Sequence, residues 1–341
     1  GMKRLGARPI ILCKPGSRLG ERAEGAGIEV RLHPMRSNRD ISALLYALKV
    51  IKDDSVDVVN THSGDDSFIC AIAGRLSSRK PVVVRTRHLA LPITSKTTYS
   101  LFPHRVVTVS EFVRRYLVEE VGIPADRVTA VATGVDLARF DPDSVPDTLR
   151  SELGTGTSTL VVGTVAILRR KKGHHVLLDA IPEIIKECRD VFFVFAGDGP
   201  QRENIEERIK ELGIGASVRL LGLRKDVPTI LKGLDIFVLP TLQEALGTSV
   251  LEASAMRKPV VGTAVGGVPE AIRDNVTGLL VKPEDAKGLA NAIIRLLKDG
   301  GLRKRMGDEG RLMVEAGYST EKMVEKMHKV YSELLAGRRQ R

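Results

Sequence analysis

Residues 239–253 contain two glutamates, Glu244 and Glu252, on either side of a predicted helix start. An apolar run that predicts a strand comes first, and Gly247-Thr248-Ser249 opens the helix that carries Glu252. The free N–H groups of a helix start bind anions, the glycine lets a phosphate approach, and the two hydroxyl side chains are able to cap. The eight-residue spacing puts the carboxylates at most about 12 Å apart, roughly the length of a nucleotide diphosphate sugar. An ordinary capping loop with a solvated Glu252 fits the same pattern.

Two histidines directly follow predicted strands. His88 comes after a strand at 81–86, and His62 comes after a strand at 56–60. Ligands of open parallel sheets bind at the carboxyl ends of the strands, so each imidazole is placed to hold a sugar or an acceptor hydroxyl. Each ring also suits a hydrogen bond to a loop carbonyl. Asp65, close behind His62, is expected on the acceptor side.

The elements that position these residues alternate between strand and helix, which is typical of a parallel sheet covered by helices on both faces. In the first part, strands are predicted at 10–13, 56–60, 81–86 and 105–109, and helices at 17–27, 40–52 and 65–78. Residues 133–159 are rich in Gly, Pro, Asp, Ser and Thr and predict a linker. The alternation then restarts, with strands at 160–166, 191–196, 217–220, 236–240, 259–263 and 278–281 and helices at 199–212 and 248–256. We therefore expect two doubly wound domains, 1–145 and 146–319, and an amphipathic helix at 320–336 that packs back on the first.

Composition excludes several classes of protein. The chain has 341 residues, 43% of them hydrophobic, and a net charge of +11. Its length and hydrophobic fraction allow a large core and exclude a disordered or a collagen-like protein. No apolar run approaches the roughly 18 residues that cross a bilayer. Three separated cysteines favour a reducing cytoplasm over disulfides or a zinc site. Eight Phe, five Tyr and no Trp are poor material for stacking bases, which argues against nucleic acid as the partner of the positive charge.

Taken together, the motifs resemble the retaining nucleotide-sugar glycosyltransferases of family 4, which have the GT-B fold. The resemblance rests on the E-x7-E spacing of Glu244 and Glu252 and on Gly266-Gly267-Val268-Pro269-Glu270 behind it. Further matching segments are 195–200, 221–228, 277–281, 106–110 and 133–136, so that the likeness covers about residues 10 to 335. It implies an α/β protein with two Rossmann-like domains that face each other across a cleft.

The resemblance also implies roles for individual residues. Glu244 would hold sugar hydroxyls, the amides of Leu246, Gly247 and Thr248 would contact sugar and phosphate, and Glu252 would accept from the ribose. Lys172 matches the lysine that stabilises charge on the leaving diphosphate. His88 matches the histidine near the reactive carbon of the sugar, and His62 resembles another histidine of the family. The donor-binding loops would include Gly197, Leu223 and Arg224, the last two through their backbone near the base.

Two departures from the family pattern stand out. The family usually has an arginine five residues before the lysine, where this chain has Ile167, and Arg169 is the expected replacement. The family also opens with a strand, a Gly-rich loop and a helix, whereas the first predicted strand here matches the second of the family. Either the start codon is misassigned, or the first domain lacks its first strand and helix. Asp141-Pro142-Asp143 matches a metal-binding DxD motif but lies in the linker, so a metal-independent reaction is expected.

The predicted activity is transfer of a sugar, with retention, from a nucleoside-diphosphate sugar to a cell-envelope glycan, lipid-linked or lipopolysaccharide acceptor. The sugar nucleotide is a substrate, and no cofactor is expected. The basic surface fits a cytoplasmic protein held at the inner face of an anionic membrane, and it fits plain solubility equally well. The alternative is a degenerate nucleotide-sugar-binding protein without turnover. A related GT-B epimerase or phosphorylase is a third candidate, although no pyridoxal-binding lysine is identifiable.

Overall fold

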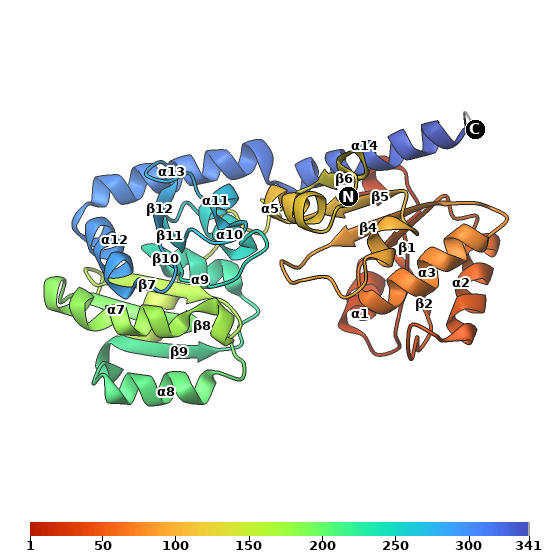
Figure 1. The fold of residues 1–341 in the computed structure, drawn as a ribbon. Helices are drawn as coiled ribbons and strands as arrows, with labels where there is room; N and C mark the ends of the chain where they lie inside the picture. The colour runs from red at the N-terminus through yellow and green to blue at the C-terminus, as the bar shows by residue number, and fades with distance from the viewer. Residues whose placement is uncertain (340–341) are drawn as a thin grey trace. The chain divides into compact units, whose positions relative to one another are not determined.

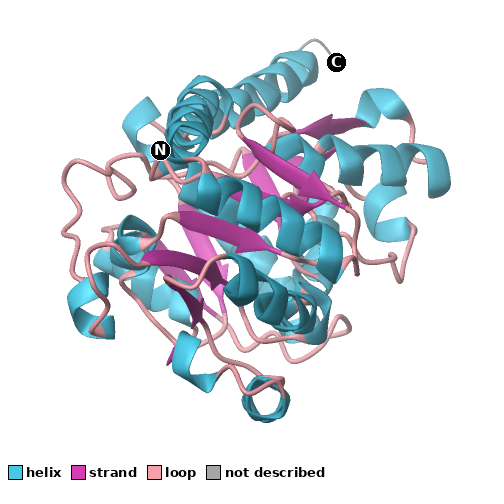
Figure 2. Ribbon diagram, turned by 90° about the vertical axis from the view of Figure 1, so that its left-hand side faces the viewer, coloured by secondary structure: helices cyan, strands magenta, loops and turns pink. Residues whose placement is uncertain are grey.

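The computed structural model describes residues 1–339, without the side chains of Asp65 and Arg339. The chain forms two compact units, one made of residues 1–132 and 323–341 and the other of residues 133–322 (Figure 1). Strands lie between helices in the ribbon of Figure 2, as the sequence predicts for doubly wound α/β units. Among the described helices, none is both long and apolar enough to cross a membrane.

Unit 1 contains two parallel sheets. The smaller sheet pairs β1 (Ile10–Cys13) with β2 (Glu29–Leu32), and the larger has the order β3-β4-β5-β6. Its strands are β3 (Val58–Thr61), β4 (Val82–Arg87), β5 (Arg105–Thr108) and β6 (Val128–Ala130). Within the described chain, β1 and β3 each pair on one side only. The expected loss of a first strand and helix stays a prediction.

Helices cover both sheets of unit 1. They are α1 (Arg18–Gly25), α2 (Ile41–Asp53), α3 (Gly64–Leu76), α4 (Thr97–Ser100), α5 (Glu111–Arg115) and the π-helical turn Tyr116–Glu120. The carboxylate of Asp40 caps α2, and Asp66 and Ser63 form a capping box at α3, which fixes where each helix leaves its strand. The far end of the chain supplies one more helix, α14 (Thr320–Arg339). Its Val330 is buried against Val84 and Val107 of the sheet.

Unit 2 is built on one six-stranded parallel sheet with the order β12-β11-β10-β7-β8-β9. Its strands are β7 (Leu160–Val165), β8 (Val191–Ala196), β9 (Val218–Gly222), β10 (Ile236–Leu239), β11 (Val260–Thr263) and β12 (Gly278–Val281). Its helices are α6 (Leu149–Leu153), α7 (His174–Glu187), α8 (Arg202–Glu211), α9 (Val227–Gly233), α10 (Thr248–Ala255), α11 (Val268–Ala271), α12 (Ala286–Lys298) and α13 (Gly300–Gly317). The core lies between the sheet and α7 and α12, with Phe193 and Phe195 fully buried.

The segment 133–148 packs on unit 2, although the sequence predicts a linker and a domain boundary at 145/146. Lys232 donates to the carbonyl of Pro142 at 2.5 Å, and Arg311 donates to the carbonyl of Phe140 at 2.8 Å. Val135 forms a bridge with Ser319. Because these bonds tie the segment to α9 and α13, the boundary of the compact units falls at 132/133. The predicted linker also contains a short helix, α6, whose Leu149 is fully buried.

Candidate functional site

The strand order of unit 2 reverses between β7 and β10. From β7 the chain continues to β8 on one side, whereas β10 lies on the other side of β7. Loops that leave the two strands at such a switch point diverge and leave room for a ligand at the carboxyl edge of the sheet. Lys172 follows β7 and Glu244 follows β10. The topology therefore brings together two predicted residues that are 72 positions apart in the chain.

Lys172 and Glu244 form an ion pair across this switch point. The lysine Nζ lies 2.5 Å from Oε2 of the glutamate, and the two side chains are 17% and 16% exposed. Oε1 of Glu244 also accepts from the amide of Ala245 at 3.2 Å. A half-buried pair of this kind holds both charged groups in one orientation at the edge of the sheet.

Glycines allow the two loops to approach closely. Gly173, next to Lys172, has φ +67°, and a Cβ there would lie 1.8 Å from the carbonyl oxygen of Pro240. Gly266 has φ +58°, and its Cβ would lie 2.0 Å from the carbonyl oxygen of Glu244. Both positions combine a left-handed backbone with a contact that no side chain tolerates. These glycines fix the backbone of the Lys172 loop and of the Glu244 loop.

The start of α10 lies in the same loop as Glu244. Its N-cap is Gly247, with φ +91°, and no side chain caps the helix. The expectation that Thr248 or Ser249 caps is therefore wrong, because the helix begins at Thr248 and the position before it has no side chain. Among the described residues, no group accepts from the amides of Gly247, Thr248 or Ser249. Free amides at a helix start, together with the helix dipole, are suited to bind an anion. Leu246, just before them, is buried.

Glu252 lies on α10 and is partly buried. Burial raises the pKa of its carboxyl to about 7, and Arg139 opposes this shift. Arg139 comes from the segment 133–148, and the Gly- and Pro-rich composition of that segment does not indicate that one of its arginines influences Glu252. A half-buried carboxylate facing one arginine is suited to accept hydrogen bonds from hydroxyls.

The remaining predicted donor residues take different positions. Gly197, at the end of β8, has φ +151°, and a Cβ there would lie 1.9 Å from the carbonyl oxygen of Ala166. Leu223 is 70% exposed. The guanidinium of Arg224 is occupied by Glu152 at 2.5 Å and Asp226 at 2.6 Å, which leaves its backbone as the part that a base would meet. Arg169 lines a small pocket with residues of α7 and α8. Its carbonyl accepts from the amide of Lys172 at 2.9 Å, but no described hydrogen bond or ion pair joins its guanidinium to Lys172 or Glu244.

In unit 1, the structure joins the two predicted histidines. His62 Nδ1 lies 3.0 Å from His88 Nε2, just beyond the carboxyl ends of β3 and β4. Asp66 accepts from the amide of His62 at 2.8 Å, and Arg85 lies 3.7 Å from Asp66. Asp65 lies in the first turn of α3, and its side chain is outside the described part of the structure.

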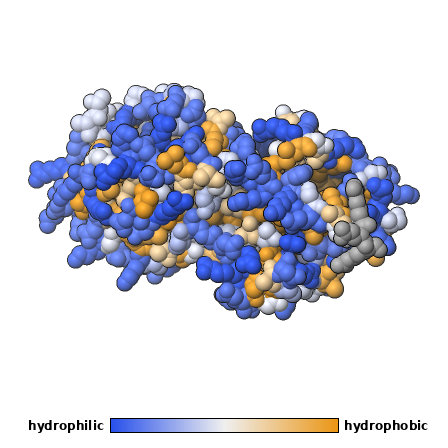
Figure 3. Space-filling view, turned by 90° about the horizontal axis from the view of Figure 1, so that it is seen from above, coloured by the Kyte–Doolittle hydropathy of each residue, from blue (hydrophilic) through white to orange (hydrophobic). Residues whose placement is uncertain are grey.

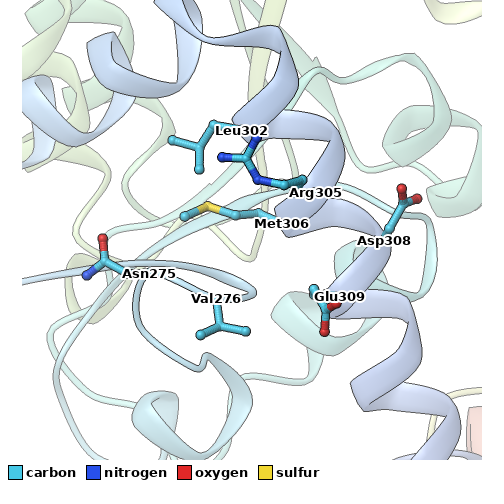
Figure 4. A pocket seen from close by; sticks show the side chains of 7 residues that line it. All are labelled: Asn275, Val276, Leu302, Arg305, Met306, Asp308 and Glu309. Atoms are coloured by element: carbon cyan, nitrogen blue, oxygen red, sulfur yellow. The ribbon is translucent and has the colours of Figure 1, made fainter.

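A surface pocket of about 520 Å³ lies elsewhere on unit 2, between the loop before β12 and the helix α13 (Figure 4). Its lining residues are Asn275, Val276, Leu302, Arg305, Met306, Asp308 and Glu309. None of them belongs to the predicted site. Among the described side chains, no group of three His, Cys, Asp or Glu is arranged to hold a metal ion. The expectations of a metal-independent reaction and of no cofactor stay predictions.

Comparison with known proteins identifies the class. Residues 146–313 match the glycosyl transferases group 1, and residues 1–139 match glycosyltransferase family 4. The chain belongs to the group 1 glycosyltransferases, and the predicted family and its GT-B fold are confirmed.

Individual relatives cover most of the chain. It is 33% identical over 306 residues to N-acetyl-α-D-glucosaminyl L-malate synthase of Bacillus anthracis, which covers 87% of this chain and 80% of the relative. It is 26% identical over 316 residues to UDP-Gal:α-D-GlcNAc-diphosphoundecaprenol α-1,3-galactosyltransferase of Escherichia coli, covering 88% and 81%. A solved glycosyltransferase from Rickettsia africae ESF-5 superposes with a TM-score of 0.90 at 26% identity, over 98% of this chain and 92% of that chain.

Proposed function

We propose that this glycosyltransferase moves a sugar, with retention at the anomeric carbon, from a nucleoside diphosphate to a cell-envelope glycan, lipid-linked or lipopolysaccharide acceptor. The observation that supports binding of a sugar-nucleotide donor is the Lys172–Glu244 ion pair beside the uncapped start of α10. At one edge of the sheet, a cation and free amides suit the diphosphate of a sugar nucleotide, and a carboxylate suits the hydroxyls of its sugar. Glu252 supplies a further carboxylate, for the ribose.

The proposed chemistry uses charge stabilisation. The bond between the anomeric carbon and the diphosphate oxygen breaks, and its electron pair leaves with the diphosphate. The acceptor hydroxyl oxygen forms the new bond on the same face, while its proton passes to the departing phosphate. Lys172 offsets the charge that grows on the diphosphate, and Glu244 orients the sugar through its hydroxyls. Before the donor binds, the two residues compensate each other's charge.

The lipid-linked acceptor is supported by how the charge is distributed. Unit 1 contains 26 Lys and Arg against 15 Asp and Glu, whereas unit 2 contains 27 of each, so unit 1 accounts for the whole net charge of +11. On α2, Ile41 and Leu45 are 72% and 61% exposed, and the exposed Lys49 and Lys52 follow them. Apolar and basic side chains together fit the surface of an anionic bilayer. Figure 3 shows apolar residues scattered over a largely hydrophilic face of the molecule. The E. coli relative, by its name, takes a diphosphoundecaprenol acceptor.

A thermal-shift panel with UDP, GDP, ADP and their sugars tests the donor half. A nucleotide at a hundred times its Kd adds about 2.7 kcal/mol to the unfolding free energy, which raises the melting temperature measurably. We expect one base to be preferred and its sugar form to add to the shift. No shift with any nucleotide would contradict the proposal.

A binding protein without turnover is the second candidate. It is favoured by Ile167, which stands where the family has an arginine, and by Arg169, which lines a different pocket. Release of nucleotide from a bound sugar nucleotide separates the two candidates. A binding protein would give the thermal shift and no nucleotide release.

A further inference from the structure

A small pocket lies on unit 2 between the first turns of α7 and the helix α8. Arg169 and Arg170, from the loop before α7, line it together with Arg208 of α8. Leu178 and Ile205, which are buried, are among its other lining residues. The centres of water molecules are able to occupy about 40 Å³ of the pocket. Because one water needs about 10–15 Å³ on this measure, the pocket has room for about three waters or for one small tetrahedral ion.

Positive charge dominates this pocket. Arg208 donates to Asp179 at 2.8 and 3.0 Å and to Glu211 at 2.8 Å, so a single guanidinium holds both of these carboxylates. Within the described chain, no hydrogen bond or ion pair reaches the guanidinium of Arg169 or of Arg170. No Asp or Glu is among the described residues that line the pocket. Two such arginines are suited to bind the oxygens of an anion.

His174, the first residue of α7, also lines the pocket. It is 2% exposed, and neither of its ring nitrogens has a hydrogen-bond partner in the described part of the chain. Buried polar atoms nearly always have a partner, because an unpaired one loses its bonds to water without replacement. The two nitrogens are therefore a second observation, independent of the arginines, that indicates a bound group in this pocket.

The imidazole of His174 is neutral at neutral pH. Burial lowers its pKa to about 4, the charges of Lys172 and His175 add to the shift, and the backbone of Arg169 opposes it. A neutral imidazole carries one N–H donor and one bare nitrogen that accepts. A group that satisfies this ring therefore has to offer a hydrogen-bond donor as well as an acceptor.

Inorganic phosphate combines the properties that these residues require. At neutral pH it has negatively charged oxygens, which suit Arg169 and Arg170, and it keeps a P–O–H group, which is able to donate to the bare nitrogen of His174. Sulfate has a similar shape and charge but has no proton to donate. A water molecule satisfies the histidine but leaves the arginine charges without a counterion.

We infer that this pocket binds one hydrogen phosphate ion, whose charged oxygens accept from Arg169 and Arg170 and whose P–O–H donates to His174. The site is separate from the one proposed for the donor diphosphate, since neither Lys172 nor Glu244 is among the described residues that line the pocket. The inference therefore goes beyond the proposed function and does not depend on it.

The phosphate site is linked to Lys172 through the backbone. Arg170 and Lys172 belong to one short turn. The amide of Lys172 donates to the carbonyl of Arg169 at 2.9 Å, and the amide of Gly173 donates to the carbonyl of Arg170 at 3.0 Å. An ion that holds the two arginine side chains therefore also restrains the loop that carries Lys172.

The first experiment is an NMR titration of the full-length protein with sodium phosphate at about pH 7.5 and constant ionic strength. We expect a saturable change in the ring-nitrogen signals of His174. The same titration with sodium sulfate should give a Kd at least about tenfold higher, because sulfate offers no donor to the bare nitrogen. His174 signals that do not change with phosphate, or equal affinity for the two ions, would overturn the inference.

The second experiment compares variants in the same titration. Arg170→Gln removes one guanidinium and should raise the Kd for phosphate by about tenfold or more. Lys171→Gln is the matched control, because it removes the same charge one residue away and Lys171 is not among the lining residues. Its Kd should stay within about twofold of the wild type. Equal losses in the two variants would indicate general attraction of anions and would contradict a built site.

His174→Leu tests the role of the histidine. It should lose the preference for phosphate over sulfate in a calorimetric titration, since leucine takes no hydrogen bond from a P–O–H. A merely structural role of His174 would leave that preference unchanged, and such a result would refute the contact. Arg170→Gln, at an exposed position, provides the decisive comparison if His174→Leu does not fold.

A last comparison separates this pocket from the donor site. Lys172→Ala should keep the response of His174 to phosphate, and saturating UDP should not displace the ion from the wild type. Loss of the response in either case would show one shared anion site and would overturn the inference. If His174 responds to phosphate and no nucleotide binds, the phosphate pocket stands and the proposed function fails.

Discussion

Replacing Lys172 by alanine should slow turnover more than it weakens donor binding. The lysine charge meets a diphosphate whose charge grows as the glycosidic bond breaks, and only interactions stronger in the transition state raise kcat. Two unit charges about 4 Å apart attract by about 4 kcal/mol at an effective dielectric constant near 20. Solvent at a side chain that is 17% exposed weakens this attraction. The loss of kcat should therefore be at least about tenfold and at most about 1000-fold.

The assay is nucleotide release from the sugar nucleotide that the thermal-shift panel selects, with kcat and KM measured separately. Lys171→Ala is the matched control, because it removes the same charge one residue away from the Glu244 contact. Lys172→Ala also leaves Glu244 half-buried and unpaired, at a cost of about 1–3 kcal/mol in unfolding free energy. The double variant with Glu244→Gln should recover that stability and stay slow. Turnover of Lys172→Ala within about twofold of Lys171→Ala would refute the role of Lys172.

Three further predictions concern other parts of the chain. In urea unfolding, Gly173→Ala should lower the unfolding free energy by about 3 kcal/mol or more, and the control Gly154→Ala should lower it by about 1 kcal/mol. Both glycines have positive φ, but only at Gly173 would a Cβ meet backbone atoms. Burial raises the pKa of Glu252 from 4.5 to about 7, so the wild type should lose unfolding free energy relative to Glu252→Gln as the pH rises from 4.5 to about 7. A difference in unfolding free energy that stays constant over this pH range would contradict the prediction. The full chain should sediment with anionic vesicles and not with neutral ones, and equal binding to both would count against membrane attachment.

The sequence predicted the buried strands well, because a continuous apolar run has few alternatives. The bounds of β1, β8 and β12 were predicted without error. β2, Glu29-Val30-Arg31-Leu32, does not stand out in the sequence, because its charged and apolar residues alternate at the edge of a two-stranded sheet. The composition of 133–148 indicates a linker, because the hydrogen bonds that its carbonyls accept from Lys232 and Arg311 cannot be predicted from local composition.

For the site, the residue types could be predicted but not their pairing. Glu244 and the start of α10 lie in one segment, so their proximity follows from local spacing. The Lys172–Glu244 bond depends on the order of β7 and β10 in the sheet, and the His62–His88 bond depends on the register of β3 with β4. Sheet order and register arise from long-range packing, which a single sequence does not reveal.

Unit 1 is discontinuous along the chain, and this sets the order in which a ribosome can deliver it. Residues 133–322 emerge together and make up the whole of unit 2, whereas α14 begins more than 200 residues after the ends of β4 and β5, the strands that it covers. Until then Val84 and Val107 lack the cover that Val330 of α14 gives them, which exposes the nascent chain to chaperones and proteases. We expect a chain stopped at residue 322 to be degraded from its amino-terminal part first, with unit 2 surviving as a protected fragment.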